Sequence, residues 1–274
     1  MDATLVETPL PAQAREPGSR RGERSEEIPA LAARPGGLAE RIGTTLPPWH
    51  PISVFFAGLV LCWAGLALVT TLVGLAFTTW IVPLGSVNAK DEAPVGWLAD
   101  HRTSFLDAAS FVGSELSGGY LVPALIGAVV ILAAFQKRWL LAGFVLSSIV
   151  IESGTYRAAV FFVDRNRPDV KRLEDLPVDA SFPSGHVAAS IAMYSAFALL
   201  LMSRMTSTRN KVLVWAFAAA MPVIVALSRM YRGMHHPLDT LAGVLIGIAA
   251  LSLALLLTRV TGYVDRRRKK AHAA

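Results

Sequence analysis

Three short polar segments of this 274-residue chain carry residue types that suit phosphate chemistry. They are residues 164–168 (DRNRP), 181–186 (SFPSGH) and 228–239 (SRMYRGMHHPLD). Taken singly, each has an ordinary structural explanation, such as an arginine that follows a helix or a turn that caps one. Their chemical interpretation therefore depends on whether the fold brings the three segments together.

Four residues of these segments can hold a phosphoryl group. Arg167 and Arg229 supply planar, permanently charged guanidinium groups that suit bidentate phosphate binding. Ser184 and Gly185 precede an expected helix, so the backbone N–H groups at its start and the positive end of its dipole can hold further anionic oxygens. Glycine also lets the main chain approach a ligand closely. We expect these four residues to form an anion-binding cradle.

Two histidines and an aspartate can supply the reacting groups. His235 and Asp239 lie four residues apart at the start of an expected helix, so Asp239 can accept a hydrogen bond from His235. An imidazole oriented in this way is a better nucleophile or base. His186 comes from the opposite side of the expected site, where it can protonate a departing alkoxide. His236 also lies within helical reach of Asp239, so spacing alone leaves two candidates for the nucleophile.

The elements that must position these segments are membrane helices. The chain is 53% hydrophobic and 17% charged, which is too apolar for an ordinary soluble domain. A bilayer core about 30 Å thick needs roughly 20 apolar residues in a helix. Six runs approach this length: 52–83, 119–135, 139–163, 186–202, 211–227 and 238–258. The sequence therefore predicts an all-α, polytopic membrane protein with six transmembrane helices.

The other segments are expected to be interfacial or to form tails. Residues 95–117 fit an amphipathic helix at the membrane interface. Residues 1–48 lack a sustained apolar period, which predicts a disordered cytoplasmic tail before a membrane domain at 49–262. A basic cytoplasmic tail is expected at 263–274, and its position after an apolar run favours membrane lipids over nucleic acid as its partner. Cys62 is the only cysteine, which excludes a disulfide framework.

The basic residues predict the orientation, because lysine and arginine are retained on the cytoplasmic side of a membrane. Lys137 and Arg138 follow the second apolar run. Arg204, Arg209 and Lys211 lie between the fourth and fifth runs. With six spans, these turns and both termini share the cytoplasmic side. The sequence thus predicts a multi-pass plasma-membrane protein whose three polar segments form an active site at the outer face.

The three segments resemble the signature of the type 2 phosphatidic acid phosphatase (PAP2) superfamily, which also includes the vanadium haloperoxidases. The family pattern is Lys, six residues, Arg-Pro; then Pro-Ser-Gly-His; then Ser-Arg, five residues, His, three residues, Asp. The second and third parts match completely, at 183–186 and 228–239. The first matches only in Arg167 and Pro168, because Val160 occupies the lysine position.

The resemblance covers about residues 50–260 and implies a PAP2/haloperoxidase-like helical bundle with phosphatase activity and no metal or other cofactor. It assigns phosphohistidine formation to His235, the orientation of that ring to Asp239 and proton transfer to His186. It assigns the binding of phosphoryl oxygens to the four cradle residues. The outer segments also show no carboxylate cluster spaced for a magnesium site.

The gap at Val160 leaves one phosphate-binding cation unassigned. Arg157 lies three residues earlier, on nearly the same helix face, and is our first candidate for phosphate binding in place of the lysine. Its side chain leans toward the N-terminus of the helix, which opposes this assignment. Arg165 is the second candidate, and an ion pair between Arg157 and an intramembrane glutamate is the alternative. Glu152 is expected to pair with an arginine or to tune the site.

The expected substrate is a lipid phosphate whose tail remains in the bilayer. Undecaprenyl diphosphate, phosphatidic acid and phosphatidylglycerol phosphate all fit, and we favour the first slightly. Two other functions stay open: a non-catalytic lipid-phosphate binder or transporter, which would explain the missing lysine, and a vanadium haloperoxidase, which is expected to be soluble. The presence of both histidines and Asp239 favours catalysis.

Overall fold

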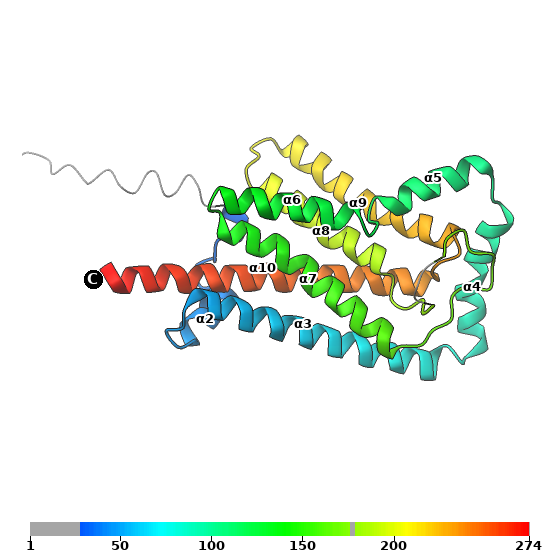
Figure 1. The fold of residues 1–274 in the computed structure, drawn as a ribbon, viewed down its shortest axis with the longest axis horizontal. Helices are drawn as coiled ribbons and strands as arrows, with labels where there is room; N and C mark the ends of the chain where they lie inside the picture. The colour runs from blue at the N-terminus through cyan, green and yellow to red at the C-terminus, as the bar shows by residue number, and fades with distance from the viewer. Residues whose placement is uncertain (1–27, 176–178, 274) are drawn as a thin grey trace, which may run out of the picture.

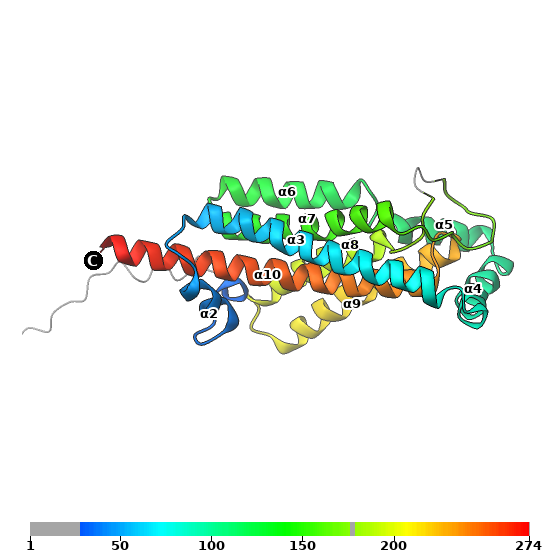
Figure 2. The same ribbon diagram turned by 90° about the horizontal axis from the view of Figure 1, so that it is seen from below.

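The computed structural model describes residues 28–175 and 179–273, and over these residues it contains helices and no strand (Figure 1). The helices of the bundle are α3 (Pro51–Ala76), which continues into the π-helical turn η2 (Phe77–Ile81), α6 (Leu121–Phe135), α7 (Trp139–Phe162), α8 (Gly185–Met202), α9 (Thr208–Tyr231) and α10 (Pro237–Ala273). The shorter elements are η1 (Pro29–Leu31), α2 (Leu38–Thr45), α4 (Gly85–Asp100) and α5 (Ser104–Glu115). The long helices run side by side in both views (Figures 1 and 2).

The bundle has the dimensions and the surface of a membrane domain. Five of its helices are long and apolar enough to span a bilayer, counting α3 and η2 as one. Large apolar side chains face outward, and Leu61, Trp80 and Phe161 are 73%, 71% and 81% exposed. Lipid tails cover such surfaces in a membrane protein. The predicted all-α, polytopic membrane fold is confirmed, whereas α6 has only 15 residues and the sixth span stays a prediction.

Two glycines let α8 and α10 pack closely. A Cβ atom at Gly243 would lie 2.5 Å from the carbonyl oxygen of Ser184, and one at Gly247 would lie 2.7 Å from that of Ala188. Small residues four apart are typical of close contacts between membrane helices. The backbone N–H of Ser184 also donates to the carbonyl of Asp239 at 3.0 Å. This packing joins the start of α8 to the start of α10.

The region expected to form one interfacial helix at 95–117 forms two helices, so that prediction was wrong in its bounds. The helix α4 begins at Gly85, ahead of the expected start at residue 95, and α5 begins after Thr103. The Thr103 hydroxyl accepts a hydrogen bond from the backbone N–H of Leu106 at 3.2 Å and so caps α5. Both helices lie at the end of the bundle opposite the C-terminus (Figure 1).

Part of the segment expected to be a disordered tail is ordered. Residues 1–27 lie outside the described residues, but η1 and α2 occupy much of 28–48. Ile28 and Leu31 are buried in the hydrophobic core between the long helices. The expectation of disorder does not hold for 28–48, because these two apolar side chains find tertiary partners that no local pattern shows.

The end of the bundle that holds the C-terminus is the basic one. The α6–α7 and α8–α9 turns, with Lys137 and Arg204, lie at this end (Figure 1). The segment expected to be a basic tail continues α10 as helix to Ala273. Arg259 of the same helix donates to the carbonyl of Ala30 at 2.9 Å. The three polar segments lie at the opposite end of the bundle.

Candidate active site

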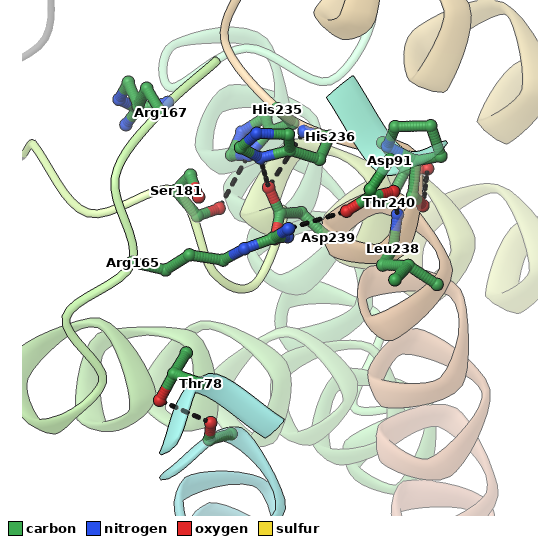
Figure 3. A network of polar contacts seen from close by, with 12 residues as sticks. Thr78, Asp91, Arg165, Arg167, Ser181, His235, His236, Leu238, Asp239 and Thr240 are labelled. Carbon is green, nitrogen blue, oxygen red and sulfur yellow. Dashed lines mark hydrogen bonds and ion pairs between the residues drawn. The ribbon is translucent and has the colours of Figure 1, made fainter. Parts of the chain in front are cut away.

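The three polar segments meet where α7 ends and where α8 and α10 begin (Figure 3). The backbone N–H of Ser181 donates to the carbonyl of Arg165 at 2.7 Å, which joins the first segment to the second. The contact between Ser184 and Asp239 joins the second to the third. The fold therefore brings together segments that are distant in the sequence.

The end of α9 explains the spacing between Arg229 and His235. The N–H of Gly233 donates to the carbonyl of Met230 at 2.9 Å, and the N–H of Met234 donates to that of Arg229 at 3.0 Å. These two bonds form a Schellman motif, which requires a left-handed residue, and Gly233 has φ +73°. Arg229 thus stands in the last helical turn, and His235 follows within electrostatic range of its guanidinium.

His235 is held as a neutral imidazole. Its side chain is buried, and Nδ1 lies 2.7 Å from the carbonyl oxygen of Ser181. Because a carbonyl can only accept, Nδ1 carries the hydrogen and Nε2 carries the lone pair. Burial and then the positive charge of Arg229 lower the pKa of His235 well below its ordinary value of 6.5. A neutral ring with a lone pair at Nε2 is the form that can act as a nucleophile.

His236 has different partners. Its Nδ1 lies 3.2 Å from Oδ2 of Asp239, and its Nε2 lies 2.9 Å from Oε2 of Glu92. Oδ2 of Asp239 also accepts the backbone N–H of His236 at 2.9 Å. The expected hydrogen bond from His235 to Asp239 was therefore wrong. Asp239 is the third residue of α10 and reaches back to the residue before that helix, as the carboxylate of a capping box does.

Asp239 belongs to a closed set of polar groups that begins and ends on α4, which we name the charge ring. Its members are Asp91, Arg165, Asp239, His236 and Glu92. Nη2 of Arg165 donates to Oδ2 of Asp91 at 2.6 Å, and Nη1 donates to Asp239. The side chains are 0–4% exposed, except that of Glu92 at 29%. Figure 3 shows most of this ring beside His235.

The cradle contains buried polar atoms that lack partners. Nη1 of Arg229 donates to Glu174 at 2.6 Å and to Ser114 at 2.8 Å. Nε and Nη2 of the same guanidinium are buried and have no partner within the described part of the chain. Ser184 precedes α8, yet its hydroxyl makes no capping bond and is equally unpartnered there. Such donors are expensive to leave unpaired and indicate a ligand site.

The other predicted phosphate-binding residues lie close to Arg229. Arg167 donates from Nη1 to the carbonyl of Met234 at 2.5 Å. Burial and then the charge of Arg229 lower the pKa of Arg167, so two like charges are held near each other. Gly185 is the first residue of α8, and His186 lies within electrostatic reach of both arginines. Two close cations beside a helix start can attract a multiply charged anion.

Neither candidate for the missing lysine joins the cradle. Arg157 is exposed on α7, and Arg165 is buried in the charge ring. Neither arginine therefore replaces the lysine that is missing at Val160. Glu152 accepts a hydrogen bond from the hydroxyl of Ser153 at 2.8 Å and forms no ion pair with an arginine among the described residues. The first role expected for it was therefore wrong, and its alternative role in tuning the site stays a prediction.

Four residues of the site were missed by sequence reasoning. Asp91 and Glu92 form an acidic pair between the first two apolar runs, which was a usable signal because a carboxylate that becomes buried needs a partner. Ser181 acts through its carbonyl, so its side chain carries no signal. Tyr156 precedes the lysine position by one helical turn, and its ring contacts Gly185.

The acidic residues near the site pair with cations. Within residues 28–175 and 179–273, no group of three or more His, Cys, Asp or Glu is arranged to hold a metal ion. Asp91 and Asp239 pair with Arg165. Glu174 pairs with both Arg229 and Arg232.

The chain is similar to known phosphatases. The sequence profile of the PAP2 superfamily matches residues 138–262. Decaprenylphosphoryl-5-phosphoribose phosphatase of Mycobacterium tuberculosis is 32% identical over 162 residues, which cover 56% of this chain and 77% of that protein. Undecaprenyl-diphosphatase of Sulfolobus acidocaldarius is 41% identical over 75 residues, which cover 27% of this chain and 32% of that protein.

A solved structure has the same fold. The crystal structure of a transmembrane PAP2-type phosphatidylglycerolphosphate phosphatase from Bacillus subtilis superposes with a TM-score of 0.54 and 23% identity, covering 79% of this chain and 96% of that one. Fold, family profile and sequence identity agree. This chain therefore belongs to the PAP2 superfamily and is a multi-pass membrane phosphatase of its metal-independent type.

Proposed function

We propose that this chain hydrolyses the phosphate ester or diphosphate of a membrane lipid through a phosphohistidine intermediate. The observation that carries the proposal is the environment of His235. Its Nδ1–H is held by the carbonyl of Ser181, while Nε2 makes no hydrogen bond within the described residues, and the ring lies within electrostatic reach of Arg229, which has unpaired donors. A neutral nucleophile beside vacant cationic donors is what attack on a phosphate requires.

The reaction has two steps that use the same groups. The lone pair on Nε2 of His235 attacks phosphorus, the phosphorus–oxygen bond to the lipid breaks, and His186 gives its proton to the leaving oxygen. His186 then takes a proton from water, the hydroxide attacks the phosphohistidine, and the phosphorus–nitrogen bond breaks to release phosphate. The cradle residues Arg167, Arg229, Ser184 and Gly185 stabilise the charge on the phosphoryl oxygens in both steps.

The proposed substrate class is a polyprenyl lipid phosphate. Two similar proteins bear names that specify decaprenyl and undecaprenyl lipids, which supports the polyprenyl class, and the second name supports our preference for undecaprenyl diphosphate. Phosphatidic acid and phosphatidylglycerol phosphate are the next candidates. The cradle lies at the end of a bundle with an apolar outer surface, so a headgroup can reach it while its tail stays in lipid.

The proposed orientation puts the cradle at the outer face and both termini in the cytoplasm. The support is the basic character of the opposite end of the bundle. In a Cys62→Ser background, single cysteines at the exposed positions Asp175 and Thr206 test it. An impermeant thiol reagent added to intact cells should label Asp175→Cys and spare Thr206→Cys. The reverse pattern would invert the topology.

Phosphate release by purified protein tests the activity. Undecaprenyl diphosphate, phosphatidic acid and phosphatidylglycerol phosphate should be compared in EDTA, with His235→Ala as the inactive control. We expect turnover in EDTA, inhibition by vanadate and no halide oxidation with vanadate. Turnover that EDTA abolishes and magnesium restores would contradict the mechanism. Binding of these lipids without phosphate release would identify a non-catalytic protein instead.

A further inference from the structure

A tyrosine lies where the cradle lacks its lysine. Tyr156 is four residues before Val160, so the two share one face of α7. We propose that the hydroxyl of Tyr156 completes the cradle by donating a hydrogen bond to a phosphoryl oxygen of the substrate. The proposal rests on the proposed phosphatase function, because it adds a substrate-binding residue to the same site.

The ring of Tyr156 contacts the first residue of α8. A Cβ atom at Gly185 would lie 2.8 Å from Cδ2 and 2.9 Å from Cε2 of this ring. These distances are shorter than real Cβ contacts allow, so glycine is needed at position 185 for the ring as well as for a ligand. Tyr156 thus forms a wall of the helix start at which anionic oxygens are expected to bind.

Two charged residues of the cradle, Arg167 and Arg229, lie within electrostatic reach of the hydroxyl of Tyr156. Glu152 lies one turn earlier on the same face but accepts its hydrogen bond from Ser153. The Tyr156 hydroxyl itself makes no hydrogen bond to any residue that the structure describes, so its donor is available to a ligand.

A neutral donor suits this position. Arg167 and Arg229 carry like charges near each other, and the charge of Arg229 adds to the effect of burial in lowering the pKa of Arg167. A lysine near them would add a third positive charge, whereas a tyrosine hydroxyl adds a hydrogen bond without charge. A hydrogen bond to a charged group contributes about 1.5–3 kcal/mol, which corresponds to roughly ten- to hundredfold in an equilibrium or rate constant.

Tyr156→Phe tests the proposal because it removes the hydroxyl and keeps the ring that packs on Gly185. We expect kcat/KM for the lipid phosphate to fall about tenfold and the inhibition constant of vanadate to rise by a similar factor. Adding Val160→Lys to this variant should recover part of both losses. Tyr120→Phe is the matched control, because Tyr120 is 89% exposed and its variant should equal the wild type.

Two results would overturn the proposal. The first is a Tyr156→Phe variant with wild-type kcat/KM and wild-type vanadate inhibition. The second is a loss of kcat/KM with unchanged vanadate inhibition, which would assign Tyr156 a packing role. Wild-type protein and His235→Ala, assayed in parallel, separate this outcome from failure of the proposed function. If wild type releases phosphate and His235→Ala does not, a normal Tyr156→Phe refutes the role of the tyrosine alone.

Discussion

The charge ring and the cradle both adjoin His235, but they differ in how completely their polar groups are paired. In the charge ring, Arg165 lies between two carboxylates. His236 lies between one of these, Asp239, and the carboxylate of Glu92. In the cradle, two nitrogens of Arg229 and the hydroxyl of Ser184 lack partners within the described ranges. An unsatisfied buried donor costs about 1–3 kcal/mol. The cradle therefore has donors available to a ligand, whereas the polar groups of the charge ring pair with one another.

The charge ring acts on the site as a support. Oδ1 of Asp91 accepts the backbone N–H of Leu238 at 3.0 Å, so α4 caps the start of α10. The backbone carbonyl of Arg165 holds Ser181, whose own carbonyl holds Nδ1 of His235. A substitution in the charge ring should thus affect catalysis by moving His235. A substitution in the cradle should affect catalysis by weakening phosphate binding.

The largest expected effect on turnover distinguishes the adjacent histidines His235 and His236. His235→Ala should abolish turnover because it removes the proposed nucleophile. His186→Ala should lower kcat/KM at least about a hundredfold because it removes the proposed general acid and base. His236→Ala should keep measurable turnover, because this histidine belongs to the charge ring. Phosphate release and trapping of the phosphorylated enzyme measure all three. An inactive His236→Ala beside an active His235→Ala would exchange the assignments.

The next effect tests the cradle. Arg229→Lys keeps the positive charge but removes the planar fork with its two unpaired donors, so kcat/KM should fall about a hundredfold and vanadate should bind more weakly. Arg172→Lys is the matched control, since its pair with Asp179 is exposed. Normal kinetics in Arg229→Lys would show that the fork is not used.

A change in the charge ring should affect stability more than phosphate binding. Asp91→Asn leaves the buried Arg165 with one carboxylate, so we expect a lower melting temperature and a loss of about tenfold or less in kcat/KM. The inhibition constant of vanadate should change little, because the cradle donors are untouched. A strong rise of that constant at an unchanged melting temperature would place Asp91 in the phosphate site.

A smaller effect concerns pH and stability. Burial and the charge of Arg229 lower the pKa of His235 well below 6.5. As the pH falls through 6.5, the unfolded chain takes up a proton at this histidine and the folded protein does not. Stability is therefore lost at about 1.4 kcal/mol per pH unit below that point.

The His235→Gln variant isolates this contribution. Its melting temperature should fall less steeply than that of wild type between pH 6.5 and about pH 5, since glutamine does not titrate. Contributions from all other titrating groups are common to the two proteins. Parallel curves of melting temperature against pH would show that the pKa of His235 in the folded state is close to its ordinary value.

Spacing within short segments predicted much of the site. The remaining contacts join residues that are distant in the sequence, so the sequence did not predict them. Arg229 and His235 are joined by a single helix end, so their spacing in sequence fixes their proximity. The sequence has two adjacent histidines near Asp239, and which of them pairs with it depends on the direction of the chain after Gly233. The sequence does not reveal that direction. Arg165 is separated from Asp91 by 74 residues, and no local pattern links them.

The smallest expected effect concerns the residue that sequence reasoning put first for the missing cation. Arg157 is exposed on α7, whereas Tyr156 beside it turns its ring toward Gly185. Adjacent residues on a helix point about 100° apart, so only one of this pair can reach the cradle. Arg157→Ala should leave kcat/KM within about twofold of wild type, because a surface charge away from the site contributes little. A tenfold loss of kcat/KM in Arg157→Ala that Val160→Lys restores would instead show that the guanidinium of Arg157 binds phosphate.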